Sequence, residues 1–196
     1  MKIAIYPGTF DPITFGHIDL IIKGLKVVNK IIVAISDVAN NDHLFSADER
    51  KSLVKNALYK DLKINKKKVK IITFNSLTTS LCKEHKANLI LRGLRAVSDF
   101  EYEFQLAGMN KKLNREIETI FLMANIENQV ISSSLVKEIA QLGGDMAKFT
   151  TKSTVRTLKE KLRRSTTKTQ KNFTHVCANS TKNLTTLFTR PRTRQF

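Results

Sequence analysis

Short apolar runs alternate along the chain with longer stretches in which apolar residues recur at helical spacing. The runs have the length and β-branched composition of buried strands, and they cover residues 2–6, 31–35, 69–74, 89–91 and 119–123. The periodic stretches predict helices over residues 16–28, 46–58, 76–86, 99–115 and 132–142, with a last helix near 155–162. This alternation predicts an α/β fold with a doubly wound, five-stranded parallel sheet and a C-terminal helix.

Polar stretches follow each of the five predicted strands. In a doubly wound sheet the carboxyl ends of the strands lie along one edge, and ligands bind there. The stretches after the strands are residues 6–17, 37–45, 75–78, 92–95 and 124–134. We therefore expect one functional site at that edge, with walls from several loops.

The stretch over residues 6–17 has the composition of an anion-binding loop. Gly8 directly follows the first strand, where a glycine permits unusual backbone angles and close approach of a ligand. The next helix begins near Gly16, so its free N–H groups and dipole face the same space. Thr9 and Thr14 add hydroxyl donors, and His17 in the first turn can donate to a phosphate oxygen.

The fourth predicted helix, over residues 99–115, has apolar residues on more than one side. Its candidates for burial are Phe100, Phe104, Leu106, Ala107 and Leu113.

The second helix begins with Ser46 and Glu49 at the spacing of a capping box, which predicts Ser46 as its N-cap.

Charge is distributed unevenly over the 196 residues. Residues 1–150 carry 22 basic and 16 acidic side chains, a net of +6, whereas residues 151–196 carry 12 basic and one acidic, a net of +11. We expect one domain over residues 1–163 and a basic, threonine-rich extension over 164–196 that is disordered or loosely packed.

No apolar run approaches a membrane span, which favours a cytoplasmic protein without a membrane partner. The two cysteines form no metal-binding spacing, so no metal-ligating residues are predicted.

Four motifs connect the predicted site to a known family. Residues 14–17 (Thr-Phe-Gly-His) match the T/H-x-G-H signature of the nucleotidylyltransferase superfamily. Residues 6–12, 92–103 and 131–137 join it in the order found in bacterial phosphopantetheine adenylyltransferases, and the chain resembles that family from residue 2 to about 163. The motif at 14–17 alone leaves several relatives open, and the block at 92–103 narrows the resemblance to this family.

The resemblance implies a Rossmann-like nucleotidylyltransferase fold and a specific reaction. Members transfer an adenylyl group reversibly from ATP to 4′-phosphopantetheine, giving dephospho-coenzyme A and pyrophosphate in coenzyme A biosynthesis. The resemblance also implies Mg²⁺ as cofactor and a homohexamer. The acceptor's own phosphate is the nucleophile, so the protein needs only to align two polyanions and stabilise charge.

The site residues follow from the same resemblance. His17 is expected to stabilise the transition state at the α-phosphate and to contact ATP. The expected acceptor-binding residues are Thr9, Asn41, Thr78 and Arg92, with Arg92 on the acceptor phosphate. The expected ATP-binding residues are Thr9, Phe10, Gly93, Leu94, Arg95, Glu103, Asn128, Gln129, Val130, Ile131, Ser132, Ser133 and Ser134. Ser133 and Ser134 also lie at a helix N-terminus, which is itself an anion site.

Some positions depart from the family pattern. Asn41 stands where the family usually has a lysine near the transferring group, and the loop 37–43 has no lysine or arginine. Loss of such a cation can cost a few kcal/mol, by analogy with the ~10²–10³-fold effects of removing one charge-stabilising donor. Thr78 stands at an acceptor-contact position that is often apolar, and Ala124 replaces a usual proline.

Three alternative interpretations stay open at this point. The first is a nucleotidylyltransferase for nicotinate mononucleotide or glycerol phosphate, which Arg92 and residues 99–103 disfavour. The second is a nucleic-acid-binding protein, suggested by the net charge of +17 but lacking aromatic residues interleaved with basic ones. The third is an adenylyltransferase fold without activity, supported only by Asn41.

Overall fold

The computed structural model describes residues 1–38, 43–95 and 97–164, with only the backbone of residues 97 and 98. Asn41 and the extension from residue 165 onward therefore lie outside the described residues. The described residues fall into two units, 1–157 and 158–164, and the sheet belongs to the first. Helical residues run from 152 to 164, in agreement with the predicted last helix. In the described part of the chain, no helix combines the length and apolar character that crossing a membrane requires.

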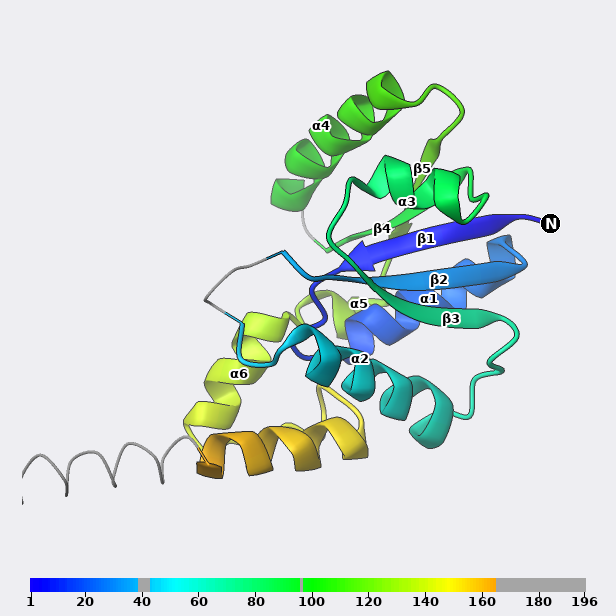
Figure 1. The fold of residues 1–196 in the computed structure, drawn as a ribbon. Coiled ribbons are helices and arrows are strands. Elements are labelled where there is room, and N and C mark those ends of the chain that lie inside the picture. The colour runs from blue at the N-terminus through cyan, green and yellow to red at the C-terminus, as the bar shows by residue number, and fades with distance from the viewer. Residues whose placement is uncertain (39–42, 96, 165–196) are drawn as a thin grey trace, which may run out of the picture. The chain divides into compact units, whose positions relative to one another are not determined.

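A five-stranded parallel sheet forms the centre of the first unit, as predicted (Figure 1). Its strands are β1 (Ile3–Gly8), β2 (Lys30–Ser36), β3 (Val69–Phe74), β4 (Leu89–Leu94) and β5 (Glu118–Met123), in the spatial order β3-β2-β1-β4-β5. The order reverses between β1 and β4, so the polar segments after these two strands meet at the carboxyl edge.

Strand β4 is longer than its apolar run predicts. Arg92, Gly93 and Leu94 pair with residues 121–123 of β5 and belong to the ladder, whereas the sequence placed Arg92 in a loop after the strand. The parallel partner supplies hydrogen bonds that make a polar residue acceptable at the strand end. Arg92 is consequently held by a regular strand.

The helices begin and end close to the predicted positions. They are α1 (Phe15–Val27), α2 (Ala47–Lys55), α3 (Thr78–Glu84), α4 (Val97–Leu113), α5 (Ile126–Gln129) and α6 (Ser133–Gln141), and a π-helical segment (Asn56–Asp61) continues α2. Ser46 is the N-cap of α2, and its side chain and that of Glu49 form the predicted capping box. The short helix α5 lies in a segment that we predicted to be a loop.

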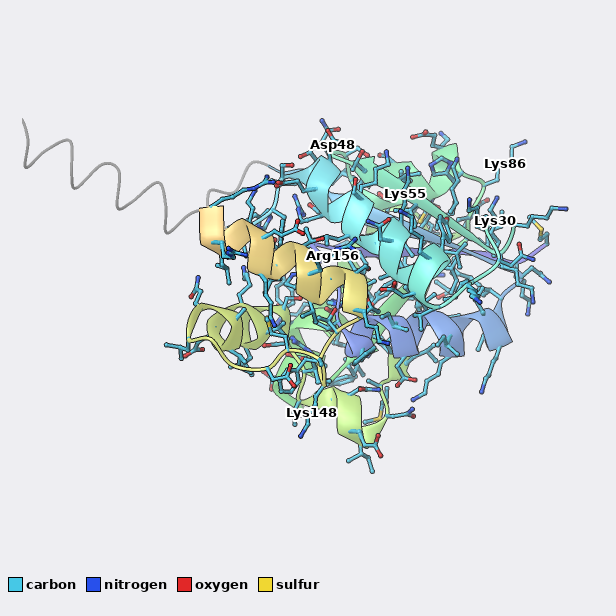
Figure 2. The ribbon with its side chains drawn as sticks, turned by 90° about the horizontal axis from the view of Figure 1, so that it is seen from below. Lys30, Asp48, Lys55, Lys86, Lys148 and Arg156 are labelled. Carbon is cyan, nitrogen blue, oxygen red and sulfur yellow. The ribbon has the colours of Figure 1, made fainter. Side chains whose placement is uncertain are left out.

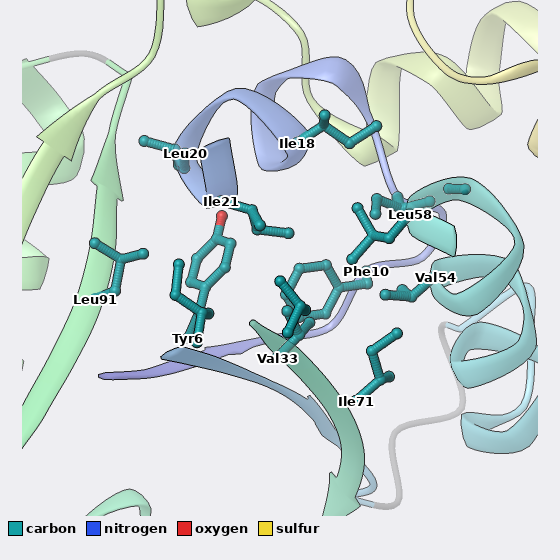
Figure 3. Packing of buried hydrophobic residues seen from close by; sticks show 14 of the residues in the cluster. Tyr6, Phe10, Ile18, Leu20, Ile21, Val33, Val54, Leu58, Ile71 and Leu91 are labelled. Carbon is teal, nitrogen blue, oxygen red and sulfur yellow. The ribbon is translucent and has the colours of Figure 1, made fainter. Parts of the chain in front are cut away.

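Side chains on the two faces of the sheet form two apolar clusters. On one face, alternate strand residues such as Tyr6 and Val33 pack against Ile21 of α1 and against Val54 and Leu58 of the α2 segment (Figure 3). The other face packs against α3 through Leu81 and Cys82. Figure 1 shows the same division, with α3 and α4 on one side of the sheet and α1 and α2 on the other.

The prediction of burial along α4 was wrong for three of its five residues. Phe100, Phe104 and Leu113 are 45%, 63% and 58% exposed, and only Leu106 and Ala107 are partly buried. One helix face packs on β4, β5 and α3, so apolar residues on its other sides stay largely exposed. The rings of Phe100 and Phe104 lie 5.8 Å apart on the exposed side.

Candidate active site

A cavity of about 600 Å³ lies at the carboxyl edge of the sheet, where the sequence predicted a site. Described residues at or just after the carboxyl ends of all five strands contribute to it. The lining residues are Tyr6, Pro7, Gly8, Thr9, Thr14, Gly16, His17, Leu20, Ser36, Phe74, Thr78, Arg92, Gly93, Arg95, Tyr102, Glu103, Leu106, Ala124, Ile131, Ser132, Ser133 and Ser134.

The cavity brings together eleven of the residues that the sequence singled out. These are Thr9, His17, Thr78, Arg92, Gly93, Arg95, Glu103, Ile131, Ser132, Ser133 and Ser134. Five others lie outside its lining, namely Phe10, Leu94, Asn128, Gln129 and Val130. The Val130 residue is 77% exposed, and Phe10 is fully buried in the core.

Other lining residues were missed by sequence reasoning. Ser36 is the last residue of β2, one residue beyond the predicted strand, and Phe74 ends β3 as it ends the predicted strand. Leu106 lies three residues after Glu103 on α4 and Tyr102 four residues before Leu106, so helical spacing could have indicated both. Leu20 is on α1, one turn beyond His17.

The first loop is shaped by Phe10 rather than by an unusual backbone at Gly8. Phe10 has the positive φ of 52°, whereas Gly8 ends β1 with ordinary strand geometry. A Cβ atom on Gly8 would lie 3.0 Å from the Phe10 ring, so the glycine makes room for that ring. The ring meets Tyr6 edge-on at 5.4 Å and His17 at 5.0 Å between centroids. Phe10 thereby packs behind the imidazole.

Hydrogen bonds from Thr14 determine the tautomer of His17. The Thr14 backbone N–H donates to His17 Nδ1 (3.1 Å), and the Thr14 hydroxyl lies 2.9 Å from the same nitrogen. Because Nδ1 accepts, the proton of the neutral ring resides on Nε2. Thr14 is completely buried, so its hydroxyl orients His17 and does not donate to an anion as predicted.

The His17 imidazole is neutral near neutral pH. Burial, and then the charge of Arg95, lower the pKa of His17 from 6.5 to about 4. The side chain lines the cavity. His17 is therefore suited to donate a hydrogen bond from Nε2 rather than to supply a positive charge.

Arg92 is held by a bidentate ion pair on the cavity wall. Its Nε donates to Glu103 Oε2 (2.6 Å), its Nη2 donates to Glu103 Oε1, and its Nη1 donates to the Pro7 carbonyl (3.0 Å). The bond to Glu103 raises the pKa of Arg92 against the lowering effect of its burial. The planar fork is thus fixed in orientation before any ligand binds.

The N-terminus of α6 forms another wall of the cavity, in addition to the first loop (residues 6–17) and the end of β4. The Ser132 side chain caps this helix by accepting from the Leu135 N–H (3.1 Å), and the Ser133 hydroxyl donates to the Pro12 carbonyl (2.8 Å). The free N–H groups of the first turn therefore lie beside the first loop, as an anion site requires. The N-cap role of Ser132 is compatible with the predicted anion-binding role of this helix N-terminus.

Helix α1 contacts the walls on either side of it. A Cβ atom on Gly16 would lie 3.1 Å from the Asn128 carbonyl, and Asp19 accepts hydrogen bonds from Asn125. A Cβ atom on Gly93 would lie 2.2 Å from Leu20 Cδ1. Glycine at residue 93 leaves room for the Leu20 side chain in its present position.

The described residues contain no group of three or more His, Cys, Asp or Glu side chains that could hold a metal ion. Glu103, a carboxylate in the cavity lining, is occupied by Arg92. A protein-built metal cage therefore does not fit this part of the chain. Mg²⁺ bound mainly through substrate phosphates needs no such cage.

The arrangement suits charge stabilisation on a phosphoryl group. A neutral N–H donor, two arginines and two helix N-termini surround one cavity. No serine–histidine or cysteine–histidine pair is seen among the described lining residues. Chemistry in which the substrates supply the nucleophile and the leaving group matches these residues.

Comparisons with known proteins identify the family of this chain. The family model described as cytidylyltransferase-like matches residues 5–139. A phosphopantetheine adenylyltransferase from Pelagibacter ubique is 67% identical over 160 residues, which cover 82% of this chain and 98% of the relative. One from Wolbachia pipientis of Culex pipiens is 52% identical over 152 residues, covering 78% and 88%.

The fold also resembles that of a solved structure. The bifunctional NMN adenylyltransferase/ADP ribose pyrophosphatase from Francisella tularensis, complexed with AMP and a manganese ion, is 18% identical with a TM-score of 0.59. The likeness covers 82% of this chain and 51% of that one. At this identity the comparison concerns the fold alone.

The parallel sheet and the phosphate-oriented cavity define a nucleotidyltransferase of Rossmann-like architecture. Within this class, the chain belongs to the cytidylyltransferase-like family and, more closely, to the phosphopantetheine adenylyltransferases.

Proposed function

We propose that this chain transfers the adenylyl group of ATP reversibly to 4′-phosphopantetheine, giving dephospho-coenzyme A and pyrophosphate. The observation that carries the proposal is the His17 Nε2–H donor, fixed by Thr14, in a cavity that also holds Arg92 and Arg95. The identity of 67% to a phosphopantetheine adenylyltransferase, over 98% of that relative, supports the choice of acceptor.

The reaction needs alignment and charge stabilisation from the protein. A phosphate oxygen of the acceptor attacks the α-phosphorus of ATP, a new P–O bond forms, the bond to the bridging oxygen of the β-phosphate breaks, and pyrophosphate leaves. We propose that His17 donates from Nε2 to an α-phosphate oxygen as charge develops there. Because the imidazole is neutral, it contributes a directed hydrogen bond and no proton transfer.

We propose that the two substrates occupy opposite parts of the cavity. Thr9, Thr78 and Arg92 are assigned to the acceptor, and Thr9 also contacts ATP. Arg92 binds the acceptor phosphate while Glu103 keeps its fork in place. The nucleotide is assigned to Phe10, Gly93, Leu94, Arg95, Glu103 and residues 128–134, of which Gly93, Arg95, Glu103 and residues 131–134 line the cavity.

A divalent cation is proposed to accompany ATP into this cavity, with Mg²⁺ as the expected ion. The basis is the triphosphate itself, which binds Mg²⁺ through its oxygens, together with the resemblance to the family. The cation would lower the charge repulsion between the two polyanionic substrates. We further propose that the reaction takes place in the cytoplasm.

The direct test is release of pyrophosphate by the purified full chain with ATP, Mg²⁺ and 4′-phosphopantetheine. Nicotinate mononucleotide and glycerol phosphate serve as competing acceptors in the same assay. Activity with 4′-phosphopantetheine and with neither of the other two acceptors supports the proposal. Activity only with another acceptor would replace it, and an inert protein that still binds ATP would favour the inactive-fold interpretation.

Asn41→Lys is expected to raise kcat/KM for 4′-phosphopantetheine, by up to the ~10²-fold that one charge-stabilising group contributes. The variant restores the cation that the family usually has at this loop position, although Asn41 lies outside the described residues. Steady-state kinetics beside the wild type measure the change, and Asn40→Lys is the matched control. Equal rates for Asn41→Lys and wild type would show that the chain does not need this cation.

We propose that the chain assembles into a homohexamer and that exposed apolar residues of α4 form part of an interface. Phe100, Phe104, Met109 and Leu113 are exposed along this one helix. Phe104→Glu is therefore expected to shift the assembly to smaller species, measured by light scattering after size-exclusion chromatography. Lys112→Glu, which changes an exposed charged residue of the same helix, is the control. An unchanged mass for Phe104→Glu would remove these residues from the interface.

A further inference from the structure

Arg50 is a buried arginine on α2 that no part of the proposed mechanism uses. It is 2% exposed and is among the largest fully buried side chains. Arginine is almost never buried to this extent without a paired acid. Among the residues that the structure describes, Arg50 makes no salt bridge; its guanidinium donates instead to backbone carbonyls.

The three carbonyls belong to three different segments at the carboxyl edge of the sheet. Arg50 Nη1 donates to the Thr9 carbonyl (2.8 Å) and to the Ser36 carbonyl (2.9 Å), and its Nε donates to the Phe45 carbonyl (3.1 Å). Thr9 follows β1, Ser36 ends β2, and Phe45 precedes the cap of α2. Thr9 and Ser36 both line the cavity.

Asp11 contacts the same segment before α2, but it accepts hydrogen bonds from backbone N–H groups instead of donating to carbonyls. Its buried carboxylate accepts from the N–H groups of Leu44 (2.9 Å) and Phe45 (3.0 Å), and it pairs with Lys137 Nζ (2.9 Å). Asp11 thus satisfies N–H donors where Arg50 satisfies carbonyl acceptors. Two buried charged groups therefore fix the segment before α2 against the first loop.

We propose that Arg50 is a positioning residue that sets the acceptor side of the cavity by tying the Thr9 and Ser36 backbones together. This inference rests on the proposed function for the identity of the acceptor. Thr9 is assigned to both substrates, but the hydrogen bonds of Arg50 reach none of the residues 128–134 that are assigned to ATP alone. Loss of the guanidinium is accordingly expected to weaken acceptor binding more than ATP binding.

The shape of the guanidinium, as well as its charge, is needed for this role. A planar fork can donate to carbonyls in several directions at once, whereas a lysine ammonium on a flexible stem cannot replace that geometry. Arg50→Lys keeps the charge and most of the length, so it tests the fork. Arg50→Met removes the charge and keeps an apolar side chain of similar length.

The experiment compares Arg50→Lys and Arg50→Met with wild type and with Lys55→Met in the full chain. Lys55 is exposed on the outer side of the same helix and serves as the matched control (Figure 2). Calorimetric titration measures the Kd of each variant for ATP and for 4′-phosphopantetheine, at a temperature where circular dichroism shows the variant folded.

Arg50→Lys is expected to raise the Kd for 4′-phosphopantetheine by about tenfold, the equivalent of one lost buried hydrogen bond, and the Kd for ATP by less than about threefold. Arg50→Met is expected to give a larger change in the same direction, and Lys55→Met no change. Equal weakening of both ligands, or no weakening in Arg50→Lys, overturns the proposal. If Arg50→Met does not fold, Arg50→Lys decides alone.

Hydrogen exchange separates this proposal from the proposed function. In Arg50→Lys, peptides that contain residues 9–13 and 36–38 are expected to exchange faster than in wild type, whereas peptides from α6 keep the wild-type rate. If wild type binds ATP but not 4′-phosphopantetheine, the proposed function fails, and the exchange pattern alone decides the role of Arg50. If all peptides of Arg50→Lys exchanged faster than in wild type to the same extent, Arg50 would contribute only to overall stability.

Discussion

Replacement of His17 by alanine is expected to lower kcat by at least ~10²-fold, the effect of removing one donor that stabilises developing charge. The structure places the Nε2–H of a neutral imidazole in the cavity, with Nδ1 held by Thr14. Because the donor acts on the transition state, the Kd for ATP is expected to change much less than kcat. Pyrophosphate release at saturating substrates measures the first quantity and calorimetric titration the second.

His85→Ala is the control for this experiment, since His85 lies at the end of α3 and is not among the cavity residues. A second variant, His17→Gln, keeps a neutral N–H donor and is expected to retain more activity than His17→Ala. Wild-type kcat in His17→Ala would remove His17 from the proposed role.

The lowered pKa of His17 gives the same residue a pH signature. The folded-state pKa is about 4 against an ordinary value of 6.5, so the unfolded chain binds this proton more readily at intermediate pH. The stability that the neutral imidazole contributes is therefore complete above pH 6.5 and is lost as the pH falls towards 4. Urea unfolding of wild type and His17→Ala across this range would show wild type losing more stability on acidification.

Arg92→Ala is the second substitution with a large expected effect, a fall in kcat/KM for 4′-phosphopantetheine of at least ~10²-fold, comparable to losing a charge-assisted bidentate contact. It also leaves the largely buried Glu103 carboxylate without its partner. Arg92 is partly exposed, so solvent screens the pair, and the expected loss of stability is about 2 kcal/mol. Kinetics and urea unfolding of the same preparation measure both quantities.

A double variant separates binding from stability at Arg92. Glu103→Gln in the Arg92→Ala background removes the unpaired charge, so the free energy of unfolding is expected to recover in part while kcat/KM stays low. Recovery of both quantities together would mean that Arg92 acts only by satisfying Glu103. Failure of stability to recover would place the cost elsewhere in the cavity wall.

Periodicity alone was sufficient to predict the sheet and most helices, because buried parallel strands and amphipathic helices leave different spacings of apolar residues. The capping box at Ser46 and Glu49 was confirmed for the same local reason. The extension of β4 through Arg92 depended on pairing with β5, which lies more than twenty residues further along the chain. The exposed side of α4 was missed because apolar residues on several faces do not indicate which face meets the sheet.

The location of the candidate site was predictable from the sequence, whereas the hydrogen bonds among its residues were not. Glycine, threonine and histidine after a strand indicated an anion site, but the hydroxyl of Thr14 serves His17 instead. The role of Arg50 depends on three carbonyls that are distant in sequence from one another. A signal existed, since Arg50 occupies the helical stripe that continues through Leu53, Val54 and Ala57, all of them buried.

The close approach of Leu20 to Gly93 has a consequence for sequence variation in this protein. A Cβ at residue 93 and a full leucine at residue 20 would occupy overlapping space. The two positions therefore share one volume, and a larger residue at 93 fits only where the side chain at residue 20 moves away or is smaller. Larger residues at position 93 are accordingly expected to occur with smaller ones at position 20, although 73 positions separate them in the chain.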